Sequence, residues 1–400
     1  MRILYHHRTA SKDGQAVHIE ELIAALREQG HEVLVVGPTA AQAEGMGVKV
    51  GWVHRLKRML PSALYELLEL AYSWVAYRRL AAAARTFRPH VLYERYNLYL
   101  LAGVMIKRRF GLPLLLEVNA PLAEERERFG GLALRTLARW SERTVWRNAD
   151  FVLPVTHVLA QHVTACGVPA ERIVVIPNGI NEEHFAQAPD AAVAKRQLGL
   201  EDRLVLGFTG FVRDWHGVDR VVRWLAGPNA PADAVLLVVG DGPARADLEQ
   251  LARSLAVAER VRFTGVVARE KIPEHVAAFD VALQPAVVPY ASPLKLFEYL
   301  ALGKAVLAPS VPNLLEILTD GDNAVLFDPR DDSTFEAGLL RLCTDAGFRC
   351  RIAAGAARTI QTRGLTWTEN ARRVIALGER AGAPRAGLAS RGSSDAVARP

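Results

Sequence analysis

The chain has 400 residues, half of them hydrophobic and 23% charged, which is enough for two soluble globular domains with sizeable cores. Its three cysteines, Cys166, Cys343 and Cys350, are scattered without a CxxC pair. This spacing argues against a disulfide framework or a zinc site and fits a reducing cytosol.

The net charge of +6 is unevenly placed along the chain. Residues 1–176 carry 23 Lys and Arg against 16 Asp and Glu, whereas the remaining residues carry 26 against 27. A basic half favours an anionic partner, which could be a membrane surface, a nucleic acid or an acidic substrate. The alternative is a solvated basic surface without a partner.

The first residues, MRILYHHRTAS, lead straight into a strand and lack the apolar core of a secretory signal. The most apolar long stretch, residues 60–77, carries Glu66 and Glu69, so we expect no transmembrane helix. We therefore expect a cytoplasmic protein, with peripheral contact at the inner face of the plasma membrane as an open alternative.

The N-terminal residues predict a parallel α/β unit. Arg2–Tyr5 is typical of a strand, a helix is expected over 17–29, and a second strand follows from residue 31. The polar loop between the first strand and the helix lies at the carboxyl end of that strand. Gly14 in this loop lets the backbone approach a ligand, or serves as a simple turn former.

Residues 52–88 are predicted to be helical and mixed in character. Aromatic residues and leucines alternate there with arginines, which is typical of a helix that lies on a membrane surface or an apolar partner. The alternative is an ordinary core helix whose arginine stems extend toward water.

Two further strands, expected over 90–97 and 113–120, end in polar residues. Ligands of an open parallel sheet bind at this carboxyl edge. The sequence therefore predicts an acceptor-binding site made by Glu94, Arg95, Glu117 and Asn119.

A turn at Pro177-Asn178-Gly179 closes the first array, and a second alternation of strands and helices begins near residue 202. We predict an α/β fold of two tandem doubly wound, Rossmann-like domains with a cleft between them. The expected units are an acceptor domain 1–176, a nucleotide-sugar domain 177–365, a C-terminal helix 366–380 that crosses back, and a disordered tail 381–400.

Three loops of the second half are expected to converge at the carboxyl ends of its strands. In the first, Gly210 allows close backbone approach while Arg213 and His216 supply positive or donor groups; in the second, Gly240 precedes a turn that opens a helix. Such loops predict a pocket for a nucleotide diphosphate. An Arg or Lys there can stabilise a developing pyrophosphate leaving group.

The third loop is the start of a helix, SPLKLFEY. Ser292 is the expected N-cap and Pro293 the expected first helical residue, with Leu294 on the inward face. Lys295 and Glu298 share one helical face, so the lysine can hold an anion and the glutamate can hold hydroxyls. A phosphate with a sugar attached would satisfy both.

The triplet Asp320-Gly321-Asp322 has the DxD form that holds metal in some sugar-nucleotide enzymes. It lies between a helix and a strand, where Asp and Gly are common turn formers, and we interpret it as a turn. With no other carboxylate cluster in the sequence, we expect neither a metal requirement nor a cofactor.

Together these motifs resemble the GT-B glycosyltransferases of the large retaining family four, over residues 1–380. The resemblance rests on the strings DGQAVHIEELIAALREQGHEVLVV, VIPNGINEEHF, FTGFVRDWHGVD, VVGDGPARADLEQLA, VRFTGVV, SPLKLFEYLALGKAVLAP and NLLEILTDGDNAVLFDP. It implies transfer of a sugar, with retention of configuration, from a nucleotide diphosphate sugar to a hydroxyl of a glycan or lipid-linked acceptor, in cell-surface polysaccharide or lipid-linked glycan synthesis. We expect no nucleic-acid partner.

The resemblance also assigns roles to residues. Glu298 matches the second glutamate of the family's paired motif, which holds the ribose hydroxyls, and Gly14 matches the glycine loop that closes over the phosphates. The full expected donor-binding set is Gly14, Gly210, His216, Gly240, Tyr290, Ser292, Pro293 and Leu294, and the expected catalytic set is Arg213, Lys295 and Glu298.

The chain departs from the family at three places. Tyr290 stands where the family has its first glutamate, and Phe211 and His216 stand at its Arg and Lys positions. The family's N-domain histidine has no clear match. We expect Arg213 and Lys295 to neutralise the diphosphate instead. A nucleotide-sugar epimerase and a catalytically inactive glycan-binding protein stay open as alternatives.

Overall fold

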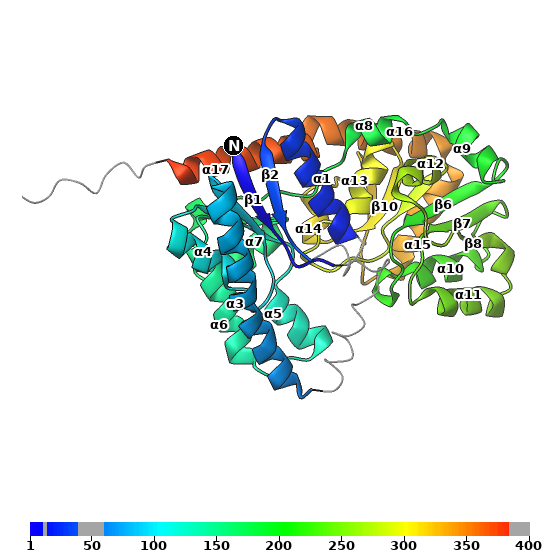
Figure 1. Ribbon diagram of the computed structural model, residues 1–400. Helices are drawn as coiled ribbons and strands as arrows, with labels where there is room; N and C mark the ends of the chain where they lie inside the picture. Colours follow the sequence, from blue (N-terminus) through cyan, green and yellow to red (C-terminus); the bar gives the residue numbers. More distant parts are fainter. Residues whose placement is uncertain (11–13, 39–59, 384–400) are drawn as a thin grey trace, which may run out of the picture.

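A computed structural model of the protein describes residues 1–10, 14–38 and 60–383 and shows two α/β lobes side by side (Figure 1). The first lobe contains a five-stranded sheet in the order β2-β1-β3-β4-β5, and the second a six-stranded sheet in the order β11-β10-β9-β6-β7-β8. Neighbouring strands pair in parallel in both sheets. The predicted pair of doubly wound, Rossmann-like domains is confirmed.

The elements of the first lobe alternate between strand and helix. Their bounds are β1 Arg2–His6, α1 Gly14–Glu28, β2 Glu32–Val36, α3 Ser62–Phe87, β3 Val91–Arg95, α4 Ala102–Phe110, β4 Leu114–Val118, α5 Leu122–Glu125, the π-helical η2 Arg126–Gly130, α6 Arg135–Asn148, β5 Phe151–Pro154 and α7 His157–Ala165.

The short η3 Ala170–Arg172 also belongs to the first lobe, since the next residue, Ile173, bridges to Val152 of β5. The second lobe follows, and α17 Trp367–Gly382 at its end crosses back to the first lobe. The bounds of the second lobe are α8 Glu182–Ala186, α9 Ala191–Gln197, β6 Leu204–Thr209, η4 Asp214–His216, α10 Val218–Leu225, β7 Ala234–Val239, α11 Arg245–Ser254, η5 Ala258–Arg260, β8 Val261–Phe263, η6 Arg269–Lys271, α12 Ile272–Ala277, β9 Val281–Leu283, α13 Leu294–Ala301, β10 Ala305–Pro309, α14 Pro312–Leu315, β11 Ala324–Phe327, α15 Asp332–Thr344 and α16 Ala346–Arg363.

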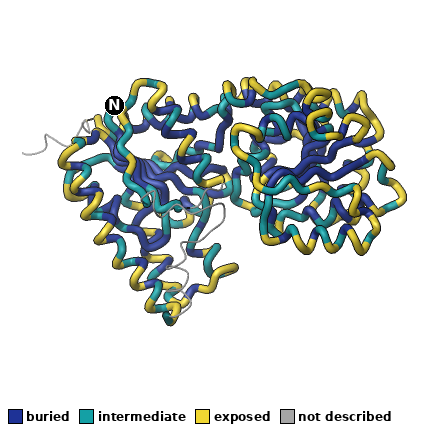
Figure 2. The backbone as a smooth tube through the Cα atoms, turned by 45° about the vertical axis from the view of Figure 1, so that its right-hand side comes forward, coloured by how far each residue is buried: buried dark blue, intermediate teal, exposed yellow. Residues whose placement is uncertain are grey.

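Each sheet separates two hydrophobic cores. Successive side chains of a strand point to opposite faces, so Ile3 and Tyr5 of β1 join one core while Leu4 joins the other. Every residue of β3, β4, β6 and β7 is buried because helices cover both faces. Figure 2 shows the two sheets as buried layers inside shells of more exposed helices.

Helix α17 runs back along the first lobe (Figure 1). Trp367, Val374 and Leu377 of this helix share a core with residues of α1 and β1. The Thr366 side chain caps the helix by accepting a hydrogen bond from the Glu369 amide. Most of the predicted tail, residues 384–400, lies outside the described residues.

The helix starts differ from the predicted ones at two functional loops. Within the described residues α1 already includes Gly14, so this glycine is helical and not part of a loop. α13 begins at Leu294, and Pro293 before it has an extended ψ of 120°. The prediction of Ser292 as N-cap is wrong, because its hydroxyl accepts a hydrogen bond from the Asn178 amide and caps no helix.

Other local predictions are confirmed. The triplet around Gly321 (φ +72°) is a turn in which Asp320 accepts a hydrogen bond from the Leu326 amide. All three cysteines are free.

The predicted helix over 52–88 begins at Ser62 as far as the structure describes it, since residues 52–59 lie outside the described part. Across the described residues, no helix combines the length and the apolar character needed to cross a bilayer.

Candidate functional site

Loops from the carboxyl ends of both sheets meet between the lobes. The Thr156 hydroxyl, after β5, donates to the carbonyl of Tyr290, which lies after β9. A Cβ atom on Gly14 would lie 3.3 Å from Cδ1 of Leu294, so the starts of α1 and α13 are in contact. These contacts bring the expected acceptor and donor loops to one place.

Two glycines let the donor loops of the second lobe pack closely. Gly210 and Gly240 have φ of +120° and +139°, which side chains other than glycine rarely adopt. A Cβ on Gly240 would lie 2.1 Å from the carbonyl oxygen of Gly210, so any larger residue would push the two loops apart. Both glycines are thus needed for loop packing, and of the two only Gly210 is exposed to a ligand.

Lys295 lies over the first of these loops. Its Nζ is 3.6 Å from the centre of the Phe208 ring, and a Cβ on Gly210 would lie 3.5 Å from Nζ. Burial lowers the pKa of Lys295 to about 7, although Glu298 works against this shift. An arriving phosphate would restore a strong preference for the charged ammonium.

His216 is held in one tautomer beside this lysine. Its Nδ1 accepts a hydrogen bond from the Arg213 amide at 3.2 Å, which leaves the proton on Nε2. Burial, with Lys295 and Arg213 nearby, lowers the pKa of His216 to about 3. The ring is therefore a neutral N–H donor at physiological pH, and the Arg213 guanidinium rests 4.8 Å from the Trp215 ring.

Glu298 lies one turn after Lys295 and is anchored to the end of β6. Its Oε2 accepts a hydrogen bond from the Thr209 hydroxyl at 3.3 Å, while the Thr209 amide donates to the Tyr299 hydroxyl at 2.9 Å. Burial raises the pKa of Glu298, and Lys295 and Thr209 oppose that rise. The residue as a whole is half-buried, and its Oε1 has no hydrogen-bond donor among the contacts of the described residues, so it could accept one from a ligand hydroxyl.

Tyr290 turns away from this cluster and crosses to the first lobe. Its hydroxyl donates to Oε2 of Glu125 at 2.7 Å, and its ring packs against the core of that lobe. The structure therefore separates Tyr290 from Lys295 and Glu298, with which it was grouped as a donor-binding residue.

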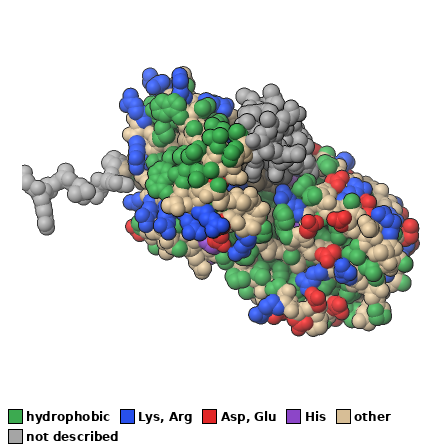
Figure 3. Space-filling model, turned by 90° about the horizontal axis from the view of Figure 1, so that it is seen from below, with side chains coloured by type: hydrophobic (Ala, Val, Ile, Leu, Met, Phe, Trp, Pro, Cys, Tyr) green, Lys and Arg blue, Asp and Glu red, His purple; other side chains and the backbone are tan. Residues whose placement is uncertain are grey.

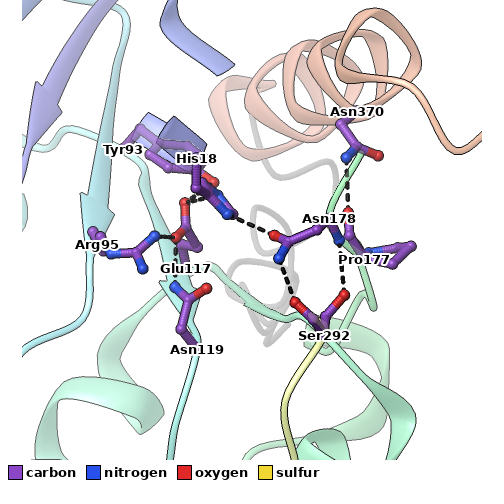
Figure 4. Close-up of polar contacts among 9 residues, drawn as sticks. All are labelled: His18, Tyr93, Arg95, Glu117, Asn119, Pro177, Asn178, Ser292 and Asn370. Carbon is purple, nitrogen blue, oxygen red and sulfur yellow. Dashed lines mark hydrogen bonds and ion pairs between the residues drawn. The ribbon is translucent and has the colours of Figure 1, made fainter. Parts of the chain in front are cut away.

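Three of the four expected acceptor residues form one buried network. Glu117 binds Arg95 and accepts hydrogen bonds from Tyr93 at 2.8 Å and Asn119 at 2.5 Å. His18 of α1 adds an ion pair, with Nε2 3.0 Å from Oε2 of Glu117 (Figure 4). Burial alone would raise the pKa of Glu117, but His18 and Arg95 hold it well below its usual range.

Glu94 lies apart from that network. It is 1% exposed, and its Oε1 is 2.6 Å from Nδ1 of His6. Neighbouring strand residues point to opposite faces, which is why Glu94 and Arg95 do not share a site.

His18 continues the network into the donor loop. Its Nδ1 lies 2.7 Å from Oδ1 of Asn178, whose amide group donates to the carbonyl of Ser292 at 2.6 Å. Asn370 of α17 donates to the carbonyl of Pro177 at 2.7 Å (Figure 4). A chain of hydrogen bonds thus joins the acceptor-side carboxylate to the loop that opens α13.

Comparison with known proteins establishes the class. Residues 13–179 match the family model described as "Glycosyl transferase 4-like domain", and residues 203–345 match "Glycosyl transferases group 1". The 2-deoxystreptamine N-acetyl-D-glucosaminyltransferase of Streptomyces fradiae is 31% identical over 293 residues, which cover 68% of this chain and 69% of the relative. The chain belongs to the group 1 glycosyltransferases.

A second relative matches this glycosyltransferase over more of its length. The D-inositol 3-phosphate glycosyltransferase of Thermomonospora curvata is 28% identical over 387 residues, or 89% of this chain and 88% of the relative. Among solved structures, HepE of Anabaena in complex with UDP is 19% identical with a TM-score of 0.73, covering 95% of this chain and 100% of that one. This likeness confirms the GT-B fold.

Sequence reasoning missed several residues of the glycosyltransferase site. His18 lies one turn after Gly14, on the side of α1 that faces the loops, and this spacing was the available signal. Asn178 was treated only as part of a turn, although a buried asparagine in a linker needs hydrogen-bond partners. Thr209 and Tyr299 gave no signal, since both look like core residues.

The structure adds one fact on metal binding. Among the described residues, no group of three or more His, Cys, Asp or Glu side chains is arranged to hold a metal ion. The positive groups near Gly210, namely Lys295 and Arg213, are the candidates for neutralising a diphosphate there.

Proposed function

We propose that this glycosyltransferase moves a sugar from a nucleotide diphosphate sugar to an acceptor hydroxyl with retention of anomeric configuration. The observation that carries the proposal is the placement of Lys295, His216 and Glu298 around the Gly210 backbone at the start of α13. Retention is inferred from the resemblance to a retaining family. The UDP in the HepE complex supports a nucleotide donor.

In this proposal each group has one task. The bond between the sugar C1 and the diphosphate oxygen breaks, the acceptor oxygen bonds to C1 on the same face, and the acceptor hydroxyl proton passes to the departing diphosphate oxygen. Lys295 and Arg213 stabilise the negative charge on the departing diphosphate, and the Nε2–H of His216 donates to it. Glu298 accepts hydrogen bonds from the ribose hydroxyls. No metal and no cofactor takes part.

We propose a glycan or lipid-linked acceptor, bound near Arg95, Glu117 and Asn119, and a peripheral position of the protein at the inner face of the plasma membrane. The names of the two relatives favour a cyclitol as a second candidate acceptor, since one acts on 2-deoxystreptamine and the other on D-inositol 3-phosphate.

The test is a matrix of UDP- and GDP-sugars against polyol, glycan and lipid-linked acceptors. We expect one donor to give a product whose anomeric proton coupling matches that of the donor, with unchanged turnover in EDTA. An inverted product would contradict retention, and loss of turnover in EDTA would contradict metal independence. An isomerised sugar from donor alone would indicate the epimerase, and a donor that binds without any turnover would indicate the inactive glycan-binding protein.

Lys295→Met should weaken UDP binding by roughly 10- to 100-fold, because a charge-assisted hydrogen bond to phosphate is lost. In the free protein the pKa of Lys295 is about 7, so at higher pH the ammonium must be formed on binding. Wild-type affinity should therefore fall as pH rises above 7, with proton uptake, and the variant should lack this dependence. Titration calorimetry in two buffers measures both effects.

The matched control is Lys271→Met, which removes an exposed lysine paired with Glu274. It should bind UDP like the wild type. Equal affinity of the Lys295 variant and the wild type from pH 6 to 9 would show that Lys295 does not contact the diphosphate.

A further inference from the structure

Helix α3 carries its acidic side chains inward. Glu66 is 3% exposed and accepts hydrogen bonds from the Tyr99 hydroxyl at 2.8 Å and from the amides of Ala133 and Leu134. Glu69 forms a two-fold hydrogen-bonded pair with Arg126. Both carboxylates are therefore used to bind the neighbouring loop of the first lobe.

Several large apolar side chains of α3 point outward, although Leu80 of the same helix is buried in the core. Leu67 is 47% and Trp74 57% exposed, and the spacing of three or four residues places the exposed set on one face over about three turns. An ordinary surface helix has the opposite arrangement, with polar residues outside. The exposed apolar residues of the helix are Leu64, Leu67, Leu68, Trp74 and Val75.

The chain from Arg126 to Leu134 lies against the inward side of the N-terminal half of α3, because it supplies the partners of Glu66 and Glu69. The five exposed apolar residues lie on the opposite side of the helix. We call these five residues the outer face. Figure 3 shows hydrophobic side chains gathered on the first lobe, with Lys and Arg side chains around them.

The exposed charge of α3 is entirely positive. Its arginines, Arg78, Arg79 and Arg85, are exposed, whereas its two glutamates are buried. Because the carboxylates are buried, the large side chains exposed on this helix are leucines, a tryptophan, a valine and arginines. Trp74 also stacks on Tyr77 at 5.2 Å, which gives the face two aromatic rings at the start of the basic part.

We propose that the outer face docks on the surface of an anionic lipid bilayer. Apolar and aromatic side chains insert at the boundary between headgroups and acyl chains, and arginines on the same helix bind the anionic headgroups. A second copy of the chain fits less well, because it would bring the same arginines without any exposed acidic partner from α3. The contact specifies the membrane position that accompanies the proposed function, but it needs neither donor nor acceptor.

The test is flotation of the full chain with phosphatidylglycerol-containing vesicles and with pure phosphatidylcholine vesicles. We expect binding to the anionic vesicles, weakened by added salt because the Arg–headgroup attraction is screened. The double variant Leu67→Ser/Trp74→Ser should lose at least roughly ten-fold in bound fraction at any salt concentration. Arg78→Gln/Arg85→Gln should bind more weakly at low salt and show a smaller salt dependence.

Matched controls lie on the second lobe. Val266→Ser removes an exposed valine and Arg253→Gln an exposed arginine, and both should bind vesicles like the wild type. Equal thermal unfolding midpoints would show that the Leu67/Trp74 variant is folded.

Three outcomes would overturn the docking proposal: no binding by the wild type, equal binding by the Leu67/Trp74 variant, or loss of binding in the Val266 control. A wild-type dimer that the Trp74 substitution splits, without vesicle binding, would assign the face to a second copy. UDP binding by the same proteins tests the donor site separately, so failure of the docking proposal and failure of the proposed sugar transfer are distinguishable.

Discussion

Glu298→Gln should reduce kcat/KM for sugar transfer by roughly 10- to 10²-fold, because an amide oxygen accepts the two hydrogen bonds from the ribose hydroxyls more weakly than a carboxylate does. The fold should survive. Glutamine keeps the side-chain length, and its amide can still bond the Thr209 hydroxyl that now donates to the carboxylate at 3.3 Å. Steady-state kinetics with the donor identified by the matrix above measures the loss.

The same variant makes a stability prediction with a definite sign. Because burial raises the pKa of Glu298 in the folded protein, the ionised carboxylate destabilises the fold above the ordinary carboxyl pKa, and this cost is absent below it. Glu298→Gln should therefore unfold at the same temperature as the wild type or higher at neutral pH. Glu336→Gln on the exposed side of α15 is the control. A kcat/KM of the Glu298 variant equal to that of the wild type would contradict the proposed ribose-binding role.

His18→Leu should cost roughly 1–3 kcal/mol of unfolding free energy, because the buried Glu117 carboxylate loses one hydrogen-bonding partner while Arg95 still pairs with it. Both ring nitrogens of His18 lie near acceptors, with Glu117 at 3.0 Å and Asn178 Oδ1 at 2.7 Å. Leucine removes both contacts and leaves the Glu117 carboxylate to Arg95 and the two neutral donors. Urea unfolding measures the loss.

The His18 network also has a defined pH window. The pKa of Glu117 lies well below its usual range in the folded protein, so its contribution to stability is present above the unfolded carboxyl pKa and is lost as pH falls through the folded value. The excess stability of the wild type over His18→Leu should therefore hold at neutral pH and shrink only in acid.

His18→Gln separates positioning from bulk stability, because glutamine can bond one of the two partners. Compared with His18→Leu, we expect His18→Gln to have a higher unfolding free energy. Its kcat should nevertheless be as low as that of His18→Leu, because the link from Glu117 through Asn178 to Ser292 is still broken. His157→Gln removes an exposed histidine of α7 and should behave like the wild type. If His18→Leu has the unfolding free energy and the kcat of the wild type, the His18 network neither stabilises the fold nor positions the donor loop.

Local sequence patterns were sufficient for the architecture. The central strands are runs of apolar residues because helices bury both of their faces. These runs alternate with segments of helical periodicity, and both patterns can be recognised without knowing any long-range contact. The glycines at the donor loops could be recognised for a similar reason, since Gly210 and Gly240 follow directly after strands. Lys295 and Glu298 were found from helical spacing alone.

Side-chain partners could not be predicted in this way. The Ser-Pro pair before α13 is a good local signal for a helix N-cap. In the structure, however, the Ser292 hydroxyl accepts a hydrogen bond from the backbone amide of Asn178, 114 residues earlier. Nothing close to Tyr290 in the sequence predicts that its side chain points away from the donor loop. Its hydroxyl does so because it donates a hydrogen bond to Glu125 of the other lobe.

The sequence by itself determined that this protein has two Rossmann-like lobes, donor loops rich in glycine and a helix start suited to a phosphate, because these depend on periodicity and on short-range backbone geometry. Only the tertiary structure decided that His18 pairs with Glu117 and that α3 buries its glutamates while several of its leucines stay exposed. Both results depend on polar partners far away in the sequence, and a buried carboxylate lies wherever the fold supplies enough donors to satisfy it.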